Sequence, residues 1–208
     1  MKLPERWQQA GGELAARGIV VGLYVVLTRN LLTDYLQTGR LTGLLLLITE
    51  LLVIVFTVVR RRALSIDRSM PALIVTSISV MGPLLVRAVP GQGLVPDLAT
   101  TCASALGLSI TIAAKLALGR SFGIVPANRG VVSAGVYRLV RHPIYAGHII
   151  THLAFAVAHP IAWNVIVLAV ADAALIVRAL REERVLMADV AYADYCRRVA
   201  WHVVPGVF

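Results

Sequence analysis

The sequence is poor in charged residues, in acidic residues above all, and in cysteine and histidine. Only 15% of its 208 residues are charged, and 11 Asp and Glu stand against 20 Lys and Arg. The two cysteines, Cys102 in an apolar run and Cys196 in a basic tail, do not form the disulfide framework of a small secreted domain. Five histidines are too few for the membrane metal enzymes that use histidine boxes.

Apolar residues, by contrast, are abundant. They make up 58% of the chain, and the mean hydropathy is +0.79, whereas soluble domains have ~45–50% apolar residues. We therefore expect a membrane protein, in which a basic excess indicates cytoplasmic loops before it indicates nucleic-acid binding. If about six segments of ~20 residues cross the bilayer, roughly 90 residues remain, too few for a soluble Rossmann-type catalytic domain. An active site would then be built from helix ends and short loops.

Six apolar runs have about the length of membrane-spanning helices. They lie at residues 18–36, 41–59, 71–89, 98–118, 144–158 and 161–179. The first run is the weakest, because Arg29 and Asp34 lie toward its end. The last two are separated only by the turn at His159 and Pro160, which predicts a tight helical hairpin. The polar stretch over residues 1–18 is expected to form an interfacial or solvated helix.

The distribution of basic residues predicts an orientation. With the N-terminus inside, most basic residues, Lys115 among them, fall on the cytoplasmic side, and only Arg29, Arg40 and Arg87 fall outside. This bias predicts five to six spans with both termini on the cytoplasmic side of an inner, cytoplasmic membrane. Arginine far outnumbers lysine, which hints at a GC-rich genome and a bacterial source. The predicted fold is an all-α, polytopic bundle with a terminal helical hairpin.

Two polar segments, residues 119–147 and 178–206, flank that hairpin and should therefore meet at one membrane interface. In the first, Arg141, His142 and Tyr145 mark the start of the fifth apolar helix. Pro143 suits its first turn, where a missing N–H costs nothing. Free amides at this helix start would offer a seat for a carboxylate or phosphate.

The second polar segment places Glu182 and Glu183 just past the sixth span, with Arg178 one helical turn before Glu182. Each feature also has a simpler interpretation: Arg and His at a membrane boundary often act as snorkelling anchors, and paired glutamates often form a solvated face. The aromatic residues of the tail could line an interfacial belt; they are Tyr192, Tyr195 and Trp201. The combination on one face favours a site for a polar small molecule.

An ordered set of motifs in the C-terminal half resembles a known family. YRLVRHPIYAG at 137–147 is followed by an apolar hairpin, REERVL at 181–186, the Tyr192–Tyr195 segment and a closing Val-Pro. Over roughly residues 119–206 the chain resembles the isoprenylcysteine carboxyl methyltransferases and, more loosely, the phospholipid N-methyltransferases. The frequent Phe-Gly pair after the glutamates is replaced here by Val190 and Ala191. Residues 1–118 match only in being hydrophobic, so we divide the chain into N-terminal scaffold helices, 1–118, and a catalytic region, 119–208.

The resemblance implies an S-adenosylmethionine-dependent methyltransferase without a Rossmann fold, with a cytosolic cofactor loop and a C-terminal helix. The positions that would bind the cofactor are Arg129, Gly130, Val131, Val132, Tyr137, Arg141, His142, Pro143, Ile144, Tyr145 and Glu182. Arg178 falls on the position of the substrate-contacting arginine, and Glu183 would assist it, so these two are the predicted catalytic residues. No metal site is expected.

The chemistry of the cofactor agrees with this assignment. Its sulfonium and amine need negative charge, which Glu182 supplies, and its carboxylate needs amides or an arginine. A carboxylate acceptor needs no base but needs a cation such as Arg178 to orient it. An amine acceptor would need a base, for which His142 is the nearest imidazole.

We therefore expect a lipid-like or isoprenylcysteine-like acceptor, presumed to carry a carboxylate, that enters sideways from the bilayer. Membrane lipid is an expected partner and nucleic acid is not, while the oligomeric state stays open. Two alternatives remain: a membrane NAD(P)H-dependent reductase, because sterol reductases resemble this family in their terminal helices, and a catalytically silent lipid-binding protein.

Several polar residues lie inside the apolar runs. His148 and His152 are four residues apart on one helix face, a spacing compatible with a shared metal, although a polar interhelical contact is favoured. Ionisable groups in spans are costly and usually functional or paired. Asp172 could pair with His148 or line a substrate cavity, whereas Glu50 has no predicted partner. Two glycine pairs, Gly18/Gly22 and Gly39/Gly43, have the spacing of close helix packing.

Overall fold

The computed structural model describes residues 5–59, 65–67, 69–89, 91, 93–121, 127–128 and 131–208. Helices make up most of these residues, and this confirms the prediction of an all-helical chain. They are α1 (Glu5–Thr38), α2 (Thr42–Val59), α3 (Met70–Met81), α4 (Asp97–Leu118), α5 (Pro143–Ala158), α6 (Ala162–Leu186) and α7 (Val190–Arg198). Short 3-10 turns lie at Gly82–Leu85, Gly119–Ser121 and Gly135–Arg138, and β1 (Ser65–Ile66) pairs antiparallel with β2 (Ala127–Asn128).

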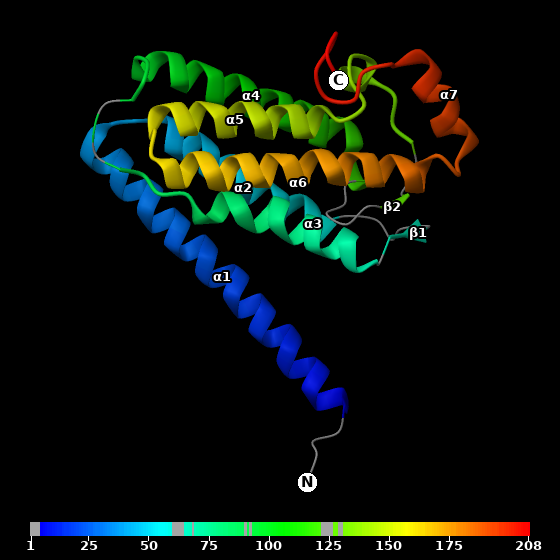
Figure 1. Cartoon of the computed structure of the whole chain (residues 1–208), viewed down its shortest axis with the longest axis horizontal. Helices are drawn as coiled ribbons and strands as arrows, with labels where there is room; N and C mark the ends of the chain where they lie inside the picture. The colour runs from blue at the N-terminus through cyan, green and yellow to red at the C-terminus, as the bar shows by residue number, and fades with distance from the viewer. Residues whose placement is uncertain are drawn as a thin grey trace.

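The helices α3 to α6 run lengthwise through the molecule, and α5 and α6 lie side by side (Figure 1). α5 packs most extensively on α4, and α6 packs most extensively on α3. At one end, which we call the tail end, α5 begins, α6 ends and α7 follows. At the other, the turn end, α1 and α5 end and α2, α4 and α6 begin. The N-terminal part of α1 projects away from the other helices (Figure 1).

Local sequence signals explain where the helices begin. The side chain of Ser69 accepts a hydrogen bond from the N–H of Ala72 and so caps α3, and Asp189 caps α7 in the same way through Ala191. Pro143 occupies the first turn of α5, as predicted. The predicted hairpin is confirmed, since α5 ends at Ala158 and α6 begins at Ala162. The expected interfacial helix and first apolar run form one continuous helix, α1.

Two helices, α4 and α6, are long and apolar enough to cross a membrane by length and composition. Shorter apolar helices lie at Thr42–Phe56, Met70–Leu85 and Pro143–Ala158. Large apolar side chains point outward along the bundle: Val25 on α1, Leu116 on α4 and Ile166 on α6 are each more than half exposed. Such a surface suits contact with lipid better than contact with water.

The closest helix packing lies between α4 and α5, at Gly107 and Gly147. A Cβ added at Gly147 would lie 2.5 Å from the carbonyl oxygen of Gly107, and one at Gly107 would lie 2.6 Å from the carbonyl oxygen of Gly147. Neither position tolerates a side chain without moving a helix backbone. The predicted pairs differ: Gly18, Gly22 and Gly39 meet nothing within 4 Å. Close approach at this crossing fixes the position of α5, the helix on which most candidate site residues lie.

Candidate functional site

A buried carboxylate at the tail end joins three segments of the chain. Glu183 Oε1 lies 2.9 Å from His142 Nε2 and 2.6 Å from His202 Nδ1, and Arg141 Nη1 donates to Glu183 Oε2 at 3.0 Å. We call these four residues the Glu183 clasp. The clasp connects the end of α6 with the start of α5 and with the C-terminal tail.

Main-chain hydrogen bonds reinforce the clasp. The N–H groups of Arg141 and His142 donate to the carbonyls of Trp201 and His202 at 2.9 and 2.8 Å. The Arg141 side chain donates further to the carbonyls of Val199 and Cys196. The amides of Arg141 and His142, expected to be available to an anion, are therefore taken by the tail. No signal in the sequence pointed to this pairing, since His202 is 60 residues from His142.

Next to the clasp, three side chains from α5 and α6 face one another. The hydroxyl of Tyr145 donates to Glu182 Oε2 at 2.6 Å. The guanidinium of Arg178 lies over the Tyr145 ring, 5.2 Å from its centroid, a favourable cation–π arrangement. The His142 ring also stacks on the Tyr145 ring, with the two centroids 5.1 Å apart. The structure thus brings together Tyr145, Arg178 and Glu182, which the sequence had singled out separately.

Arg178 and Tyr145 also line a narrow cavity inside the bundle. Its lining comes from α2, α3, α5 and α6 and consists of Glu50, Val53, Ser79, Val80, Ile144, Tyr145, His148, Leu175 and Arg178. Arg178 is buried, and its Nη1 donates to Ser79 Oγ at 3.4 Å. Ser79 was not predicted to take part, because nothing in the local sequence of α3 distinguishes it. A cation at the wall of a mostly apolar cavity suits the anionic end of an amphipathic molecule.

A second carboxylate meets two histidines deeper in the bundle. Glu50 Oε1 on α2 lies 3.3 Å from His148 Nδ1 and 3.4 Å from His152 Nε2. The other ring nitrogen of His152 lies 2.5 Å from Asp172 Oδ1 on α6. We call these four residues the Glu50 cluster. Asp172 therefore pairs with His152 and not with His148, and Glu50, which had no predicted partner, has two.

The segment before α5 is held by α7. The hydroxyl of Tyr195 donates to the carbonyl of Tyr137 at 2.7 Å. Both tyrosines belong to a buried hydrophobic cluster, and Val131 and Val132 pack against it. Burial, together with the nearby Cys196, raises the pKa of Tyr195 to about 12, so the phenol stays a neutral donor. Burial likewise raises the pKa of Tyr137.

Of the remaining predicted site residues, two are buried at the start of α5 and two lie outside the described residues. Pro143 and Ile144 are buried in the first turn of α5. Arg129 and Gly130, assigned to the cofactor loop, lie outside the described residues. Lys115, counted with the cytoplasmic loops, is instead completely buried on α4. A lone lysine at the end of an apolar run gives no local sign of which way its side chain points.

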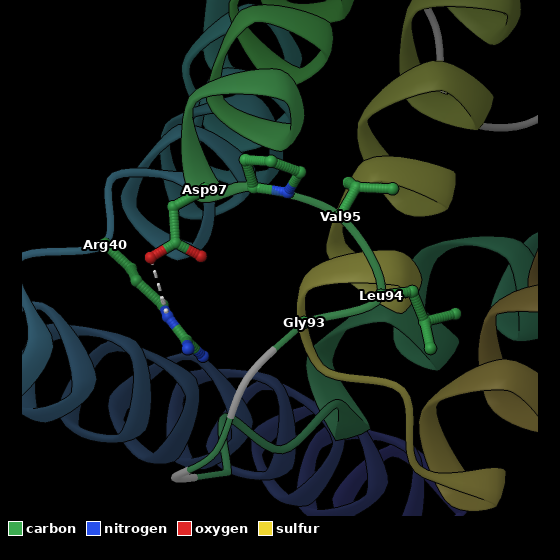
Figure 2. Close-up of a pocket in the computed structure, with 6 residues that line it drawn as sticks. Arg40, Gly93, Leu94, Val95 and Asp97 are labelled. Atoms are coloured by element: carbon green, nitrogen blue, oxygen red, sulfur yellow. Dashed lines mark hydrogen bonds and ion pairs between the residues drawn. The ribbon is translucent and has the colours of Figure 1, made fainter.

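A separate hollow lies at the turn end, at the opposite end of the bundle from the Glu183 clasp. Arg40 Nε donates to Asp97 Oδ2 at 3.2 Å across it (Figure 2). Backbone and apolar groups of the α3–α4 connection complete the lining; they are Gly93, Leu94, Val95 and Pro96. None of the predicted site residues contributes to this hollow, so the tail end and the adjoining cavity are the better candidates.

Comparison with known proteins agrees with the predicted resemblance. The model of the phospholipid methyltransferase family matches residues 98–193, just under half of the chain. The match contains nearly all of α4, the whole of α5 and α6 and the first turn of α7, and so every predicted site residue, whereas Glu50, Ser79 and His202 lie outside it. No curated protein matches the sequence. The resemblance to this group of membrane methyltransferases is confirmed, and the match covers the group without singling out its isoprenylcysteine branch.

Proposed function

We propose that this protein, whose residues 98–193 match the phospholipid methyltransferase family, is an integral membrane enzyme that methylates a lipid-like acceptor with S-adenosylmethionine. The observation that carries the proposal is the contact between Tyr145, Glu182 and Arg178. The Glu182 carboxylate contacts the Tyr145 hydroxyl, and the Arg178 guanidinium lies over the Tyr145 ring and lines the inner cavity. This arrangement separates a place for a cation from a place for an anion.

The donor set fits S-adenosylmethionine. The cofactor supplies an electrophilic methyl group, and its positive groups require a carboxylate such as Glu182, which the Tyr145 hydroxyl holds in place. Tyr137, Val131, Val132, Pro143 and Ile144 would form the apolar wall, with Arg129 and Gly130 completing the loop. Arg141 and His142 would support this wall from behind, because their side chains are bound to Glu183. Glu183 is then a positioning residue.

The cavity favours a carboxylate acceptor. Arg178 is the guanidinium of its wall, and a carboxylate is already nucleophilic and needs only orientation at ~3–3.5 Å from the methyl carbon. An amine acceptor would need a base, and His142, predicted for that role, is not among the residues that line the cavity. An isoprenylcysteine-like molecule, with one carboxylate and a long apolar chain, has the required chemistry. Its apolar part would remain among the helices and lipid.

The proposal includes a multi-pass topology. The shorter apolar helices α2, α3 and α5 run alongside α4 and α6 (Figure 1), so one bilayer would accommodate them together. We place the tail end on the cytoplasmic side, where the basic residues of α7, Arg197 and Arg198, agree with the positive-inside bias. A fluorescent protein that folds only in the cytoplasm, fused after Phe208, should therefore fluoresce. A fusion that is inserted but dark would reverse the orientation.

Calorimetric titration of the detergent-purified chain with S-adenosylhomocysteine tests the cofactor. We expect micromolar binding, weakened tenfold or more, about 1.4 kcal/mol or above, by Glu182→Gln and by Tyr145→Phe. Asp194→Ala is the matched control, because Asp194 forms an exposed pair with Arg197 on α7. Arg178→Gln should retain cofactor binding and lose methyl transfer. A folded wild type that binds NADPH and not S-adenosylhomocysteine would replace the proposal by the reductase function.

A further inference from the structure

The Glu50 cluster brings together three side chains of the types that bind transition metals. Glu50 comes from α2, and His148 and His152 come from successive turns of α5. One ligand atom from each lies within 4.8 Å of the others, and all three residues are buried. Buried ionisable groups between apolar helices are costly and are retained where they bind or pair. The sequence showed only the two histidines, because Glu50 is 98 residues from His148.

The two contacts between Glu50 and its histidines are long for hydrogen bonds. Charge-assisted N–H···O contacts are typically about 2.7–2.9 Å, and the Glu183 clasp has contacts of 2.6 and 2.9 Å. In the Glu50 cluster both nitrogens stand off from the same oxygen, at 3.3 and 3.4 Å. Two imidazole nitrogens thus face one carboxylate oxygen at long hydrogen-bond distances.

Those distances agree with the edges of a coordination tetrahedron. With metal–ligand bonds of ~2.0–2.1 Å, two ligands of a tetrahedral site are about 3.4 Å apart, whereas neighbouring ligands of an octahedral site are about 2.9 Å apart. The observed 3.3 and 3.4 Å match the tetrahedral value. The two imidazole nitrogens form the third edge of this ligand face and lie within 4.8 Å of each other.

Asp172 prepares one of the histidines for coordination. Its Oδ1 lies 2.5 Å from His152 Nδ1, a contact that would keep a proton on Nδ1 and leave Nε2, which faces Glu50, to bind a metal. Metal-binding histidines generally donate their second nitrogen to a carboxylate in this way. Because Asp172 belongs to α6, three helices define the geometry of the site.

We propose that Glu50, His148 and His152 bind a divalent transition metal, for which Zn²⁺ is the best fit, with Asp172 orienting His152. Three protein ligands leave a fourth position, and Glu50 and His148 both line the cavity that Arg178 and Ser79 share. The fourth position therefore opens toward the place proposed for the anionic end of the acceptor. The metal site stands on its own geometry and does not depend on methyl transfer.

One other buried charge bears on this proposal. Lys115 on α4 is completely buried, and its charge interacts with that of Glu50. The competing interpretation is that Lys115 and the two histidines alone offset the carboxylate. The two interpretations differ in metal content, which can be measured directly.

The test uses the full chain, purified in detergent with a histidine-free affinity tag from cells supplied with Zn²⁺. We expect about one Zn²⁺ per chain in the wild type by elemental analysis, and at least a tenfold loss in Glu50→Gln and in His148→Gln. His202→Gln, which removes a histidine of the Glu183 clasp, is the matched control and should retain the metal. S-adenosylhomocysteine titration of the same samples separates the fate of this proposal from that of the methyltransferase.

A second measurement needs no variant. Co²⁺ added to the metal-stripped wild type should give the visible absorption bands of tetrahedral Co²⁺ and should be displaced by Zn²⁺. Less than a tenth of an equivalent of Zn²⁺ together with no Co²⁺ bands would overturn the proposal and leave the Lys115 interpretation. Full metal content in both ligand variants would also overturn it, because the ion would then be bound elsewhere.

Discussion

Two glutamates of this chain each meet two histidines, and the two groups differ in almost every other respect. Glu183 forms contacts of 2.6 and 2.9 Å with its histidines and a further ion pair with Arg141. Glu50 stands 3.3 and 3.4 Å from its histidines. Main-chain hydrogen bonds from Arg141 and His142 to the tail reinforce the first group, whereas a cavity adjoins the second.

The comparison teaches that residue types alone do not identify a site. In the Glu183 clasp both carboxylate oxygens bind side chains from the start of α5 and from the tail, which is the arrangement of a structural connection. In the Glu50 cluster both histidines face one carboxylate oxygen, Asp172 contacts the second nitrogen of His152, and His148 lines a cavity. Three features separate the two groups: the distances from the carboxylate to its histidines, the presence of a second carboxylate on one histidine, and the presence of an adjoining cavity.

The largest effect should follow from breaking the clasp. Glu183→Ala leaves the partly buried guanidinium of Arg141 and the buried ring of His142 without their carboxylate, and we expect a loss of about 3 kcal/mol in the free energy of unfolding. Denaturant unfolding in detergent micelles, followed by circular dichroism, measures it. Asp194→Ala, which breaks an exposed pair, should change little. A loss for Glu183→Ala no larger than that of the control would mean that the clasp does not hold the tail.

The next largest effect should come from Gly147→Ala, because α5 contributes to both groups. The new Cβ would lie 2.5 Å from the Gly107 carbonyl oxygen, so α4 and α5 must move apart. We expect a destabilisation of about 2 kcal/mol and a weakening of both cofactor and metal binding. Gly22→Ala is the matched control, since a Cβ there meets nothing within 4 Å. Equal behaviour of the two variants would contradict the tight crossing.

A smaller and more selective effect is expected for Asp172→Asn. The amide retains the size of the carboxylate but not its charge, and loss of such an outer partner typically lowers metal affinity about 10–100-fold. Competition between the protein and a Zn²⁺ chelator measures this change. Binding of S-adenosylhomocysteine should change far less, because Asp172 belongs to the Glu50 cluster and reaches the cofactor residues only through α5. An unchanged Zn²⁺ affinity would show that Asp172 does not orient a ligand.

The smallest effect should be that of Tyr195→Phe. The hydroxyl donates one buried hydrogen bond to Tyr137, worth about 1 kcal/mol. Burial raises the pKa of Tyr195 to about 12, from about 10 in the unfolded chain. The neutral form is thus favoured by folding, and the contribution should be complete below about pH 10 and disappear as the pH rises toward about 12. Chemical denaturation at neutral and at high pH compares the two proteins, and a pH-independent difference would contradict this account.

Much of the scaffold could be predicted, because it depends on patterns that are local in the chain. Apolar run length gave the main helices, and Pro143 and the His159–Pro160 turn marked where α5 and α6 begin. The grouping of Tyr145, Arg178 and Glu182 was accessible for the same reason, since these residues belong to the two arms of one hairpin. We predicted the polar stretch over residues 1–18 and the first apolar run as separate elements, because the composition changes near residue 18. In the structure the helix α1 continues through that change.

Contacts between distant segments could not be predicted. No periodicity relates Glu50 to His148, or His202 to Glu183, and the burial of Lys115 depends on how α4 is rotated. The crossing at Gly107 and Gly147 did have a signal: Gly-x-x-x-Thr occurs on both helices, at Thr111 and Thr151, and small residues at this spacing permit close packing. The glycine pairs chosen from the sequence had the same spacing, but Gly18, Gly22 and Gly39 face open space and Gly43 meets only side chains.

The close crossing of α4 and α5 has a consequence for how the two groups communicate. Tyr145 and His148 are three residues apart on a helix whose backbone lies close to that of α4 at Gly147. A displacement of α5 would therefore change the Tyr145–Glu182 contact and the ligand spacing of Glu50 together. Occupancy of either site by its ligand would then alter the affinity of the other, and linkage makes such a coupling equal in both directions. Both groups therefore depend on the position of α5, which is fixed by its crossing with α4 at Gly147.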